Sequence, residues 1–95
     1  MYATIRRYRT PEPEEIRRRV EVGFLPILRK QPGFVSYDLL HAGNGVMVSV
    51  TVFETQQGAE DSNRMAAEWI AENVAPLVHG RPDITKGEVV VHGCP

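Results

Sequence analysis

Residues 34–53 read FVSYDLLHAGNGVMVSVTVF, two apolar runs on either side of the pair Asn44-Gly45. Asn-Gly is the pair that a type I′ turn favours, because both central residues take a positive φ. The sequence therefore predicts a β-hairpin in which Gly43 pairs with Val46. This register predicts which side chains lie beneath the helices: Val35, Tyr37, Leu39, His41, Val46, Val48, Val50 and Val52.

The opposite face of the predicted hairpin mixes apolar and polar side chains. It carries Phe34, Leu40, Met47 and Phe53 together with small polar residues such as Ser49. An exposed apolar area of this size is unusual on a small monomer and indicates that a second subunit covers it. We expect a homodimer in which two such sheets pack face to face.

The segments outside the hairpin alternate between strand and helix patterns. Tyr2–Arg9 reads as a strand, and a helix follows from Thr10-Pro11. Gly23 and Pro26 predict that this helix bends or breaks. A second helix is expected at 55–77, a loop at 79–83 and a last strand at 84–92, with Val89-Val90-Val91 as its strongest part. The order βαββαβ is typical of the ferredoxin-like α+β fold, in which two helices cover one face of a four-stranded antiparallel sheet.

The composition predicts one globular domain over residues 1–95. The chain has 42% hydrophobic residues, a formal net charge of -1 and one cysteine. We expect a cytoplasmic protein, because a lone cysteine forms no internal disulfide and no apolar run approaches a signal peptide or a membrane span. Nucleic acid is not an expected partner, because the aromatic signature of RNA-recognition domains is absent. No grouping of His, Cys, Asp and Glu has metal-ligand spacing, so no metal is expected.

The candidate site residues are few, and each has two interpretations. Trp69 either forms the wall of a substrate cavity or packs in the core. Tyr37 and His41 share the helix-facing side, where they either bracket a ligand or, for His41, lie at the hairpin end in contact with water. Arg6 and Arg7 point to opposite faces of the first strand, so one of them reaches either the helix-side cleft or the dimer interface.

Three segments carry a resemblance to a known family over nearly the whole chain. They are QPGFVSY at 31–37, VSVTVFE at 48–54 and NRMAAEW at 63–69. With these segments the sequence resembles the antibiotic biosynthesis monooxygenase domain, whose fold is a dimeric α/β barrel. The family includes cofactor-free oxygenases of quinols and aromatic polyketides and also haem-degrading enzymes. Trp69 and His79 match the ten-residue spacing of the haem-degrading branch, but Arg6-Arg7 stands where that branch has an asparagine.

The sequence and the resemblance together predict a cofactor-independent monooxygenase of an aromatic or quinol-type small molecule. Trp69 and Tyr37 would shape the pocket with His79, His41 would act as the base, and Arg6 or Arg7 would stabilise negative charge. The alternative is a non-catalytic homodimer that binds a small molecule or is purely structural. Convergence of Trp69, Tyr37 and His41 on an open cleft would favour the enzyme, and close packing of these residues would favour the alternative.

Overall fold

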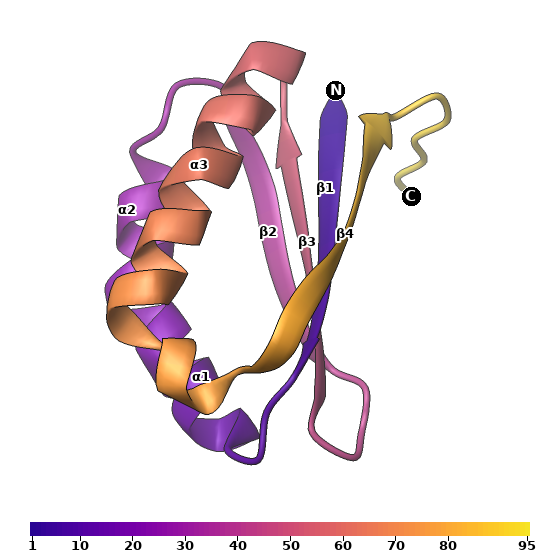
Figure 1. Ribbon diagram of the computed structural model, residues 1–95. Helices are drawn as coiled ribbons and strands as arrows, with labels where there is room; N and C mark the ends of the chain where they lie inside the picture. The colour runs from indigo at the N-terminus through magenta and orange to yellow at the C-terminus, as the bar shows by residue number, and fades with distance from the viewer.

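The computed structural model describes residues 1–95 and contains a four-stranded antiparallel sheet with the helices on one face (Figure 1). The strands are β1 (Tyr2–Arg9), β2 (Phe34–His41), β3 (Val46–Phe53) and β4 (His79–Glu88), in the spatial order β2-β3-β1-β4. The helices are α1 (Pro13–Arg19), the π-helical segment η1 (Val20–Phe24), α2 (Leu25–Arg29), α3 (Gln56–Asn73) and the 3₁₀ turn η2 (Ala75–Leu77). The predicted ferredoxin-like βαββαβ fold is confirmed.

The hairpin turn forms as predicted, but the ladder behind it is shifted by one residue. Asn44 and Gly45 have φ values of 53° and 74°, and the N–H of Val46 donates to the carbonyl of Gly43 over 3.0 Å. Gly43 also has a positive φ, of 90°, and it bulges out of the ladder. As a result Ala42, rather than Gly43, donates its N–H to the carbonyl of Val46, over 2.8 Å.

This shift exchanges the two faces of β3, because a slip of one residue moves every side chain to the other side of a strand. His41 lies opposite Met47 instead of Val48. The residues of β3 that face the helices are Met47, Ser49, Thr51 and Phe53, whereas Val48, Val50 and Val52 face away from them. The predicted faces of β3 are therefore wrong. The predicted faces of Tyr37 and Leu39 on β2 are right, since both side chains pack against the core.

The last strand lies earlier in the chain than the sequence predicts. β4 occupies 79–88, and the three valines that follow it lie outside the strand. The physical reason is the length of its partner: Glu88 already lies opposite Tyr2, at the start of β1. Beyond that point the carbonyl of Met1 accepts the N–H of Val89 over 2.9 Å.

The first helical segment is interrupted where the sequence predicts. α1 begins at Pro13, two residues later than expected, and the hydroxyl of Thr10 accepts the N–H of Glu12 over 3.0 Å. η1 contains Gly23, and Pro26 lies in the first turn of α2, directly after the π-helical turn. The π-helical turn therefore joins two α-helical pieces into one covering layer.

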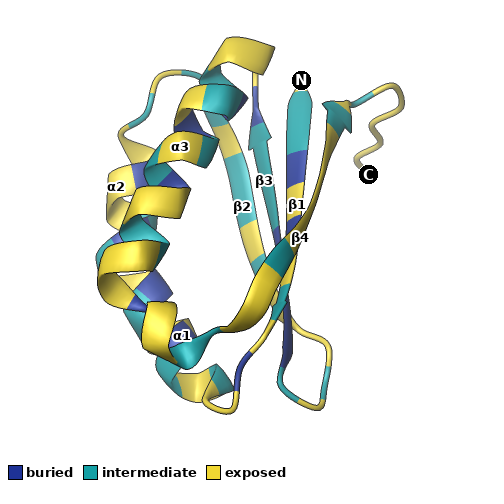
Figure 2. Ribbon diagram, viewed as in Figure 1, coloured by how far each residue is buried: buried dark blue, intermediate teal, exposed yellow.

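The core lies between these helices and the sheet (Figure 2). Its buried side chains are Ile16, Val20, Phe24, Leu28, Met47, Phe53, Ala59, Ala66 and Val74. Most of β4 is exposed, as Figure 2 shows. No helix combines the length and the apolar character that a membrane span requires.

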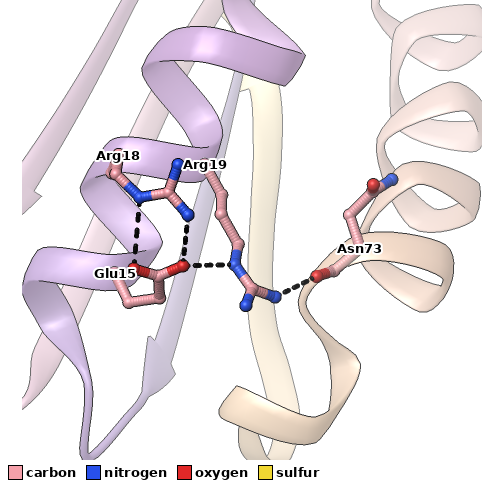
Figure 3. Close-up of polar contacts among 4 residues, drawn as sticks. All are labelled: Glu15, Arg18, Arg19 and Asn73. Atoms are coloured by element: carbon pink, nitrogen blue, oxygen red, sulfur yellow. Dashed lines mark hydrogen bonds and ion pairs between the residues drawn. The ribbon is translucent and has the colours of Figure 1, made fainter.

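A polar network ties α1 to the end of α3 (Figure 3). The carboxylate of Glu15 accepts hydrogen bonds from Arg18 at 2.6 Å and from Arg19 at 2.8 Å. Arg19 also donates to the backbone carbonyl of Asn73 over 2.7 Å. This contact satisfies one of the carbonyls that a helix leaves free at its C-terminal end.

This network predicts a loss of stability in acid. Hydrogen bonds from Arg18 and Arg19 lower the pKa of Glu15 to about 2 from its ordinary value of 4.5. Because the folded-state pKa is the lower one, the contribution is present above pH 4.5 and is lost as the pH falls toward 2. We expect Glu15→Gln to make thermal unfolding less pH-dependent in this range than Glu12→Gln, which removes a carboxylate outside the network. Equal pH dependence in the two variants would contradict this interpretation.

Candidate functional site

A small cavity lies between the helix-facing side of the sheet and the helices. Its polar and aromatic walls include Arg6 and Tyr8 from β1, Tyr37 from β2, Ser49 and Thr51 from β3, and Ser62, Asn63 and Trp69 from α3. We call this space the inner cavity. Strand pairing positions its floor, because Arg6 lies opposite Ser49 and Tyr8 follows two residues later on the same face of β1. Apolar side chains close the remainder: Val20, Phe24, Ile70 and Val74.

Three aromatic rings form one wall of the inner cavity. The ring centroid of Phe24 is 5.1 Å from that of Trp69 and 5.8 Å from that of Tyr37. A Cβ atom at Gly23 would lie 3.3 Å from Cζ2 of Trp69, tighter than most Cβ contacts. The glycine in η1 therefore allows the indole to lie directly against the helix.

Arg6 is the one charged side chain that lines the inner cavity. It is 8% exposed, and the ion pairs of the structure join other arginines. Burial lowers the pKa of its guanidinium, and the electrostatic effects of Tyr37 and Tyr8 oppose this shift. A buried cation without an acidic partner is energetically costly, so an anionic group in the cavity would be strongly favoured.

Both tyrosines of the inner cavity stay protonated at neutral pH. Burial raises the pKa of Tyr8 to about 12, although the charge of Arg6 opposes the shift. Burial, and then the effect of Tyr8, raise the pKa of Tyr37, while Arg6 and the nearby hydroxyl of Ser49 act in the opposite direction. Each phenol therefore remains available as a hydrogen-bond donor.

The inner cavity is small, and a larger groove lies beside it. The inner cavity has a free volume of about 20 Å³, which accommodates roughly one water molecule. The groove between α3 and β4 has about 350 Å³, and we call it the outer groove. Its walls include Ala67, Ala71, Ala75, Val78, Pro82 and Ile84. Arg6 and Ile70 line both spaces and separate them.

The structure brings three of the predicted site residues together and leaves three outside. Trp69, Tyr37 and Arg6 line the inner cavity. His41 is exposed at the end of β2, outside the lining, because the strand carries it past the helices into the hairpin.

Arg7 and His79 also lie outside the inner cavity. Arg7 is exposed on the opposite face of β1, since neighbouring residues of a strand point in opposite directions, and its Cα lies opposite that of Asp83. His79 is exposed at the first position of β4 and lines neither space. Of the two arginines, Arg6 is thus the one that reaches the helix-side cleft.

The sequence interpretation missed Tyr8, Ser49 and Asn63. Tyr8 was detectable, because it lies two residues after Arg6 on a strand. Ser49 was assigned to the wrong face through the register error. Asn63 lies six residues before Trp69 on α3, and only the placement of the helix over the sheet shows that it reaches the cavity.

The chemical content of the inner cavity is limited. No His, Asp or Glu side chain lines it, so it holds no ordinary general base. No group of three or more His, Cys, Asp or Glu residues in the structure is placed to hold a metal ion. The cavity combines one cation, neutral hydrogen-bond donors and flat aromatic surfaces.

Solved structures share this fold, although the sequence matches no protein-family model and no curated protein. The monooxygenase from the gene ActVA-Orf6 of Streptomyces coelicolor, in complex with nanaomycin D, has a TM-score of 0.79 at 17% identity, covering 99% of this chain and 91% of its own. SnoaB, a cofactor-independent oxygenase from Streptomyces nogalater, has a TM-score of 0.77 at 16% identity. The match covers 96% of this chain and 94% of SnoaB. The haem-degrader MhuD from Mycobacterium tuberculosis, with two haems in its active site, has a TM-score of 0.76 at 19% identity. The match covers 99% of this chain and 100% of MhuD.

The match to these proteins extends over nearly the whole chain in each comparison. This chain has the fold of the antibiotic biosynthesis monooxygenases. The predicted resemblance to antibiotic biosynthesis monooxygenases is therefore confirmed at the level of the fold. The fold includes both cofactor-independent oxygenases and a haem-degrading protein, so the reaction has to be argued from the side chains of the site.

Proposed function

We propose that this protein is a cofactor-independent monooxygenase of an aromatic or quinol-type small molecule. The observation that carries the proposal is the buried Arg6, which has no acidic partner and lies in a cavity with Tyr37 and Trp69. Such a site favours a ligand that brings an anionic group to Arg6. The shared fold with oxygenases, one of them in complex with nanaomycin D, supports this function.

The proposed reaction needs no external reductant. A ring CH₂ group, present in an anthrone or in the keto tautomer of a quinol, loses a proton, and the resulting carbanion forms a C–O bond with one atom of O₂. Protonation of the other oxygen gives a hydroperoxide, which loses water and leaves a carbonyl group. The substrate supplies all the electrons, and one oxygen atom enters the product while the other leaves as water.

The residues of the inner cavity act on the charge that develops during this reaction. Arg6 stabilises the substrate anion and so increases the acidity of the substrate. Tyr37 is protonated and donates a hydrogen bond to the oxygen that becomes negative. Trp69 provides the flat aromatic wall that the reacting edge of the substrate meets. Because no His, Asp or Glu side chain lines the cavity to accept the proton, the proton passes to solvent water as the substrate enters.

This mechanism predicts that His41 is dispensable. We expect His41→Ala to keep turnover within about twofold of the wild type, because the side chain lies outside the cavity. Trp69→Phe and Tyr37→Phe are expected to lower turnover by about tenfold or more. Steady-state oxygen uptake measures all three variants. A loss in His41→Ala as large as in Tyr37→Phe would instead assign the base to His41.

A non-catalytic small-molecule-binding or structural homodimer is the second candidate. The observation in its favour is the small free volume of the inner cavity, about 20 Å³, with Trp69 packed against Phe24. This candidate predicts no oxygen uptake with any substrate. Turnover by metal-free protein therefore separates the two functions.

The protein is also proposed to be a homodimer that covers the open face of the sheet. The helix-free face carries Val48, Val50 and Val52 from β3 with the exposed side chains of Ile5 and Leu40. A contiguous apolar area on one face of a sheet is typical of an interface. Pairing two copies would bury it on both subunits.

We expect Ile5→Asp to convert the dimer into a monomer of 10.7 kDa. Ile5 lies near the middle of the open face and is 40% exposed, so a single chain tolerates a charge there while a close interface does not. The matched control is Val22→Asp, on η1, where the side chain is 68% exposed. Sedimentation equilibrium should give a mass near twice that of the chain for wild type and control. A dimeric Ile5→Asp protein would place the interface elsewhere.

A further inference from the structure

The π-helical segment η1 forms one wall of the inner cavity. Its first and last residues, Val20 and Phe24, line the cavity and are 7% and 6% exposed. The floor of the cavity is held by the ladder between β1 and β3, and α3 forms an unbroken helix of 18 residues. Single π-helical turns within α-helices are rare and lie frequently at functional sites. η1 is therefore the irregular part of an otherwise regular enclosure.

Backbone hydrogen bonds are sparser in η1 than in an unbroken α-helix. The N–H of Leu25 donates to the carbonyl of Val20, five residues earlier, which is the bond of a π turn. The next residue, Pro26, has no N–H, so the helix lacks a hydrogen bond directly after this one. In a regular α-helix the proline ring would also clash with the carbonyl of Val22, and the wider π turn relieves this clash. A segment with few backbone hydrogen bonds opens locally at low cost.

The inward side of η1 fills the space next to Trp69. The ring centroid of Phe24 lies 5.1 Å from that of Trp69 and 5.8 Å from that of Tyr37. A Cβ atom at Gly23 would lie 3.3 Å from Cζ2 of Trp69, so the backbone of η1 also approaches the indole closely. Outward movement of η1 would separate Phe24 from both aromatic partners and free the volume of its ring.

A second groove lies on the other side of η1, beside β2, and we call it the β2 groove. It has a free volume of about 300 Å³, and Val20 and Tyr37 line both this groove and the inner cavity. Small-molecule sites start at about 300 Å³, whereas the 20 Å³ of the inner cavity accommodates roughly one water molecule. Displacing Val20 would therefore join the inner cavity to a space that is large enough for an aromatic ring.

We propose that η1 is the movable wall of the inner cavity, and that its outward movement joins the cavity to the β2 groove and admits the substrate. In the open state the hydrogen bond from Leu25 to Val20 is broken, and Val20 and Phe24 have moved off the sheet. A ligand that binds only the open state shifts the population toward it. This inference rests on the proposed function, because it describes how the substrate reaches the same site.

Deletion of Val22 together with Pro26→Ala should lock this wall. Without Val22, the residues Val20 and Phe24 are three apart instead of four, and residues three apart share one face of an α-helix. Both therefore still face the cavity, while alanine restores the N–H that Pro26 lacks. Val22 is 68% exposed, so its loss removes no core contact. Pro26→Ala alone keeps the additional residue of the π turn and is the matched control.

Hydrogen exchange and ligand binding measure the two parts of the proposal. We expect the amides of residues 20–25 to exchange about tenfold or more slowly in the locked variant than in Pro26→Ala. Equilibrium dialysis with anthrone and hydroquinone, under nitrogen to prevent turnover, should show binding by wild type and control that is about tenfold or more weaker in the locked variant. Equal exchange or equal binding in the locked variant and its control would overturn the proposal. Failure of the wild type to bind either compound would overturn it as well.

Gly23→Ala should act in the opposite direction and requires no deletion, so it tests the proposal even if the locked variant does not fold. The added Cβ crowds Trp69 in the observed state and not after η1 has moved outward. We expect exchange of residues 20–25 to become about threefold faster and binding to become tighter by a similar factor, because the open state is more populated. The control is Val22→Ala, in the same turn, which should resemble wild type. Slower exchange and weaker binding in Gly23→Ala than in this control would contradict the movable wall.

The movable wall and the oxygenase function fail in different ways. Binding that depends on η1, without oxygen uptake from any bound compound, would uphold the movable wall and remove the oxygenase function. Equal oxygen uptake by the locked variant and its control would uphold the oxygenase and overturn the movable wall.

Discussion

Arg6→Met is expected to raise the free energy of unfolding by about 1–3 kcal/mol while it abolishes turnover. Arg6 is buried without an acidic partner, so the folded protein bears the cost of desolvating its charge. Methionine fills similar space without a charge. An arginine retained for stability would behave in the opposite way, and its removal would destabilise the protein.

The matched control for this prediction is Arg7→Met, the neighbouring residue on the exposed face of β1. It should change the free energy of unfolding by less than about 0.5 kcal/mol, because surface substitutions usually have small effects. Urea unfolding at one fixed protein concentration measures both variants, since association would otherwise alter apparent stability. A destabilised Arg6→Met protein would show that Arg6 supports the fold and would contradict the proposed anion site.

Gly45→Ala is expected to destabilise the protein by about 3 kcal/mol. Gly45 has a φ of 74°, which L-residues with a side chain adopt at a cost of about 1–2 kcal/mol. An added Cβ would also lie only 2.3 Å from the backbone oxygen of Thr10. Relieving this clash would separate the two backbones and weaken the hydrogen bond from the N–H of Thr10 to the carbonyl of Gly45. The loop cannot accommodate the methyl group without moving away from β1.

Gly43→Ala provides the control, because it changes the same loop without a clash. Gly43 has a φ of 90°, and nothing lies within 4 Å of the position that its Cβ would occupy. We expect Gly43→Ala to lower the free energy of unfolding by only about 1–2 kcal/mol, from backbone strain alone. Urea unfolding of the two variants measures the difference. Similar losses in both would mean that the contact between the hairpin loop and Thr10 contributes little.

The hairpin shows how far the sequence predicts this structure. The pair Asn44-Gly45 correctly locates the turn, and the strand and helix patterns around it predict the ferredoxin-like order. The sequence does not show whether Gly43 joins the ladder or bulges out, because glycine adopts both conformations at similar cost. That single choice assigns every side chain of β3 to one face or the other.

The same limit applies to the candidate site. Tyr37 could be placed toward the helices by alternation along its strand, and Trp69 by the apolar stripe of its helix, whereas alternation left open which of Arg6 and Arg7 faces the helices. The assignment of Tyr37 survived the register error, whereas those of Phe34 and Ser49 did not, because both of these side chains lie on the helix side of the sheet. The cavity lacks a base and the outer groove exists because of the way α3 lies over β1 and β4. No local sequence pattern predicts this placement of the helix.

Oxygen uptake by metal-free protein tests the oxygenase function most directly, with anthrones and hydroquinones as substrates and the products identified. We predict turnover above the uncatalysed rate, one atom of labelled O₂ in the product, and loss of activity in Arg6→Met and Trp69→Phe. Absence of turnover with every substrate by folded, ligand-binding protein would contradict the oxygenase and favour the non-catalytic homodimer.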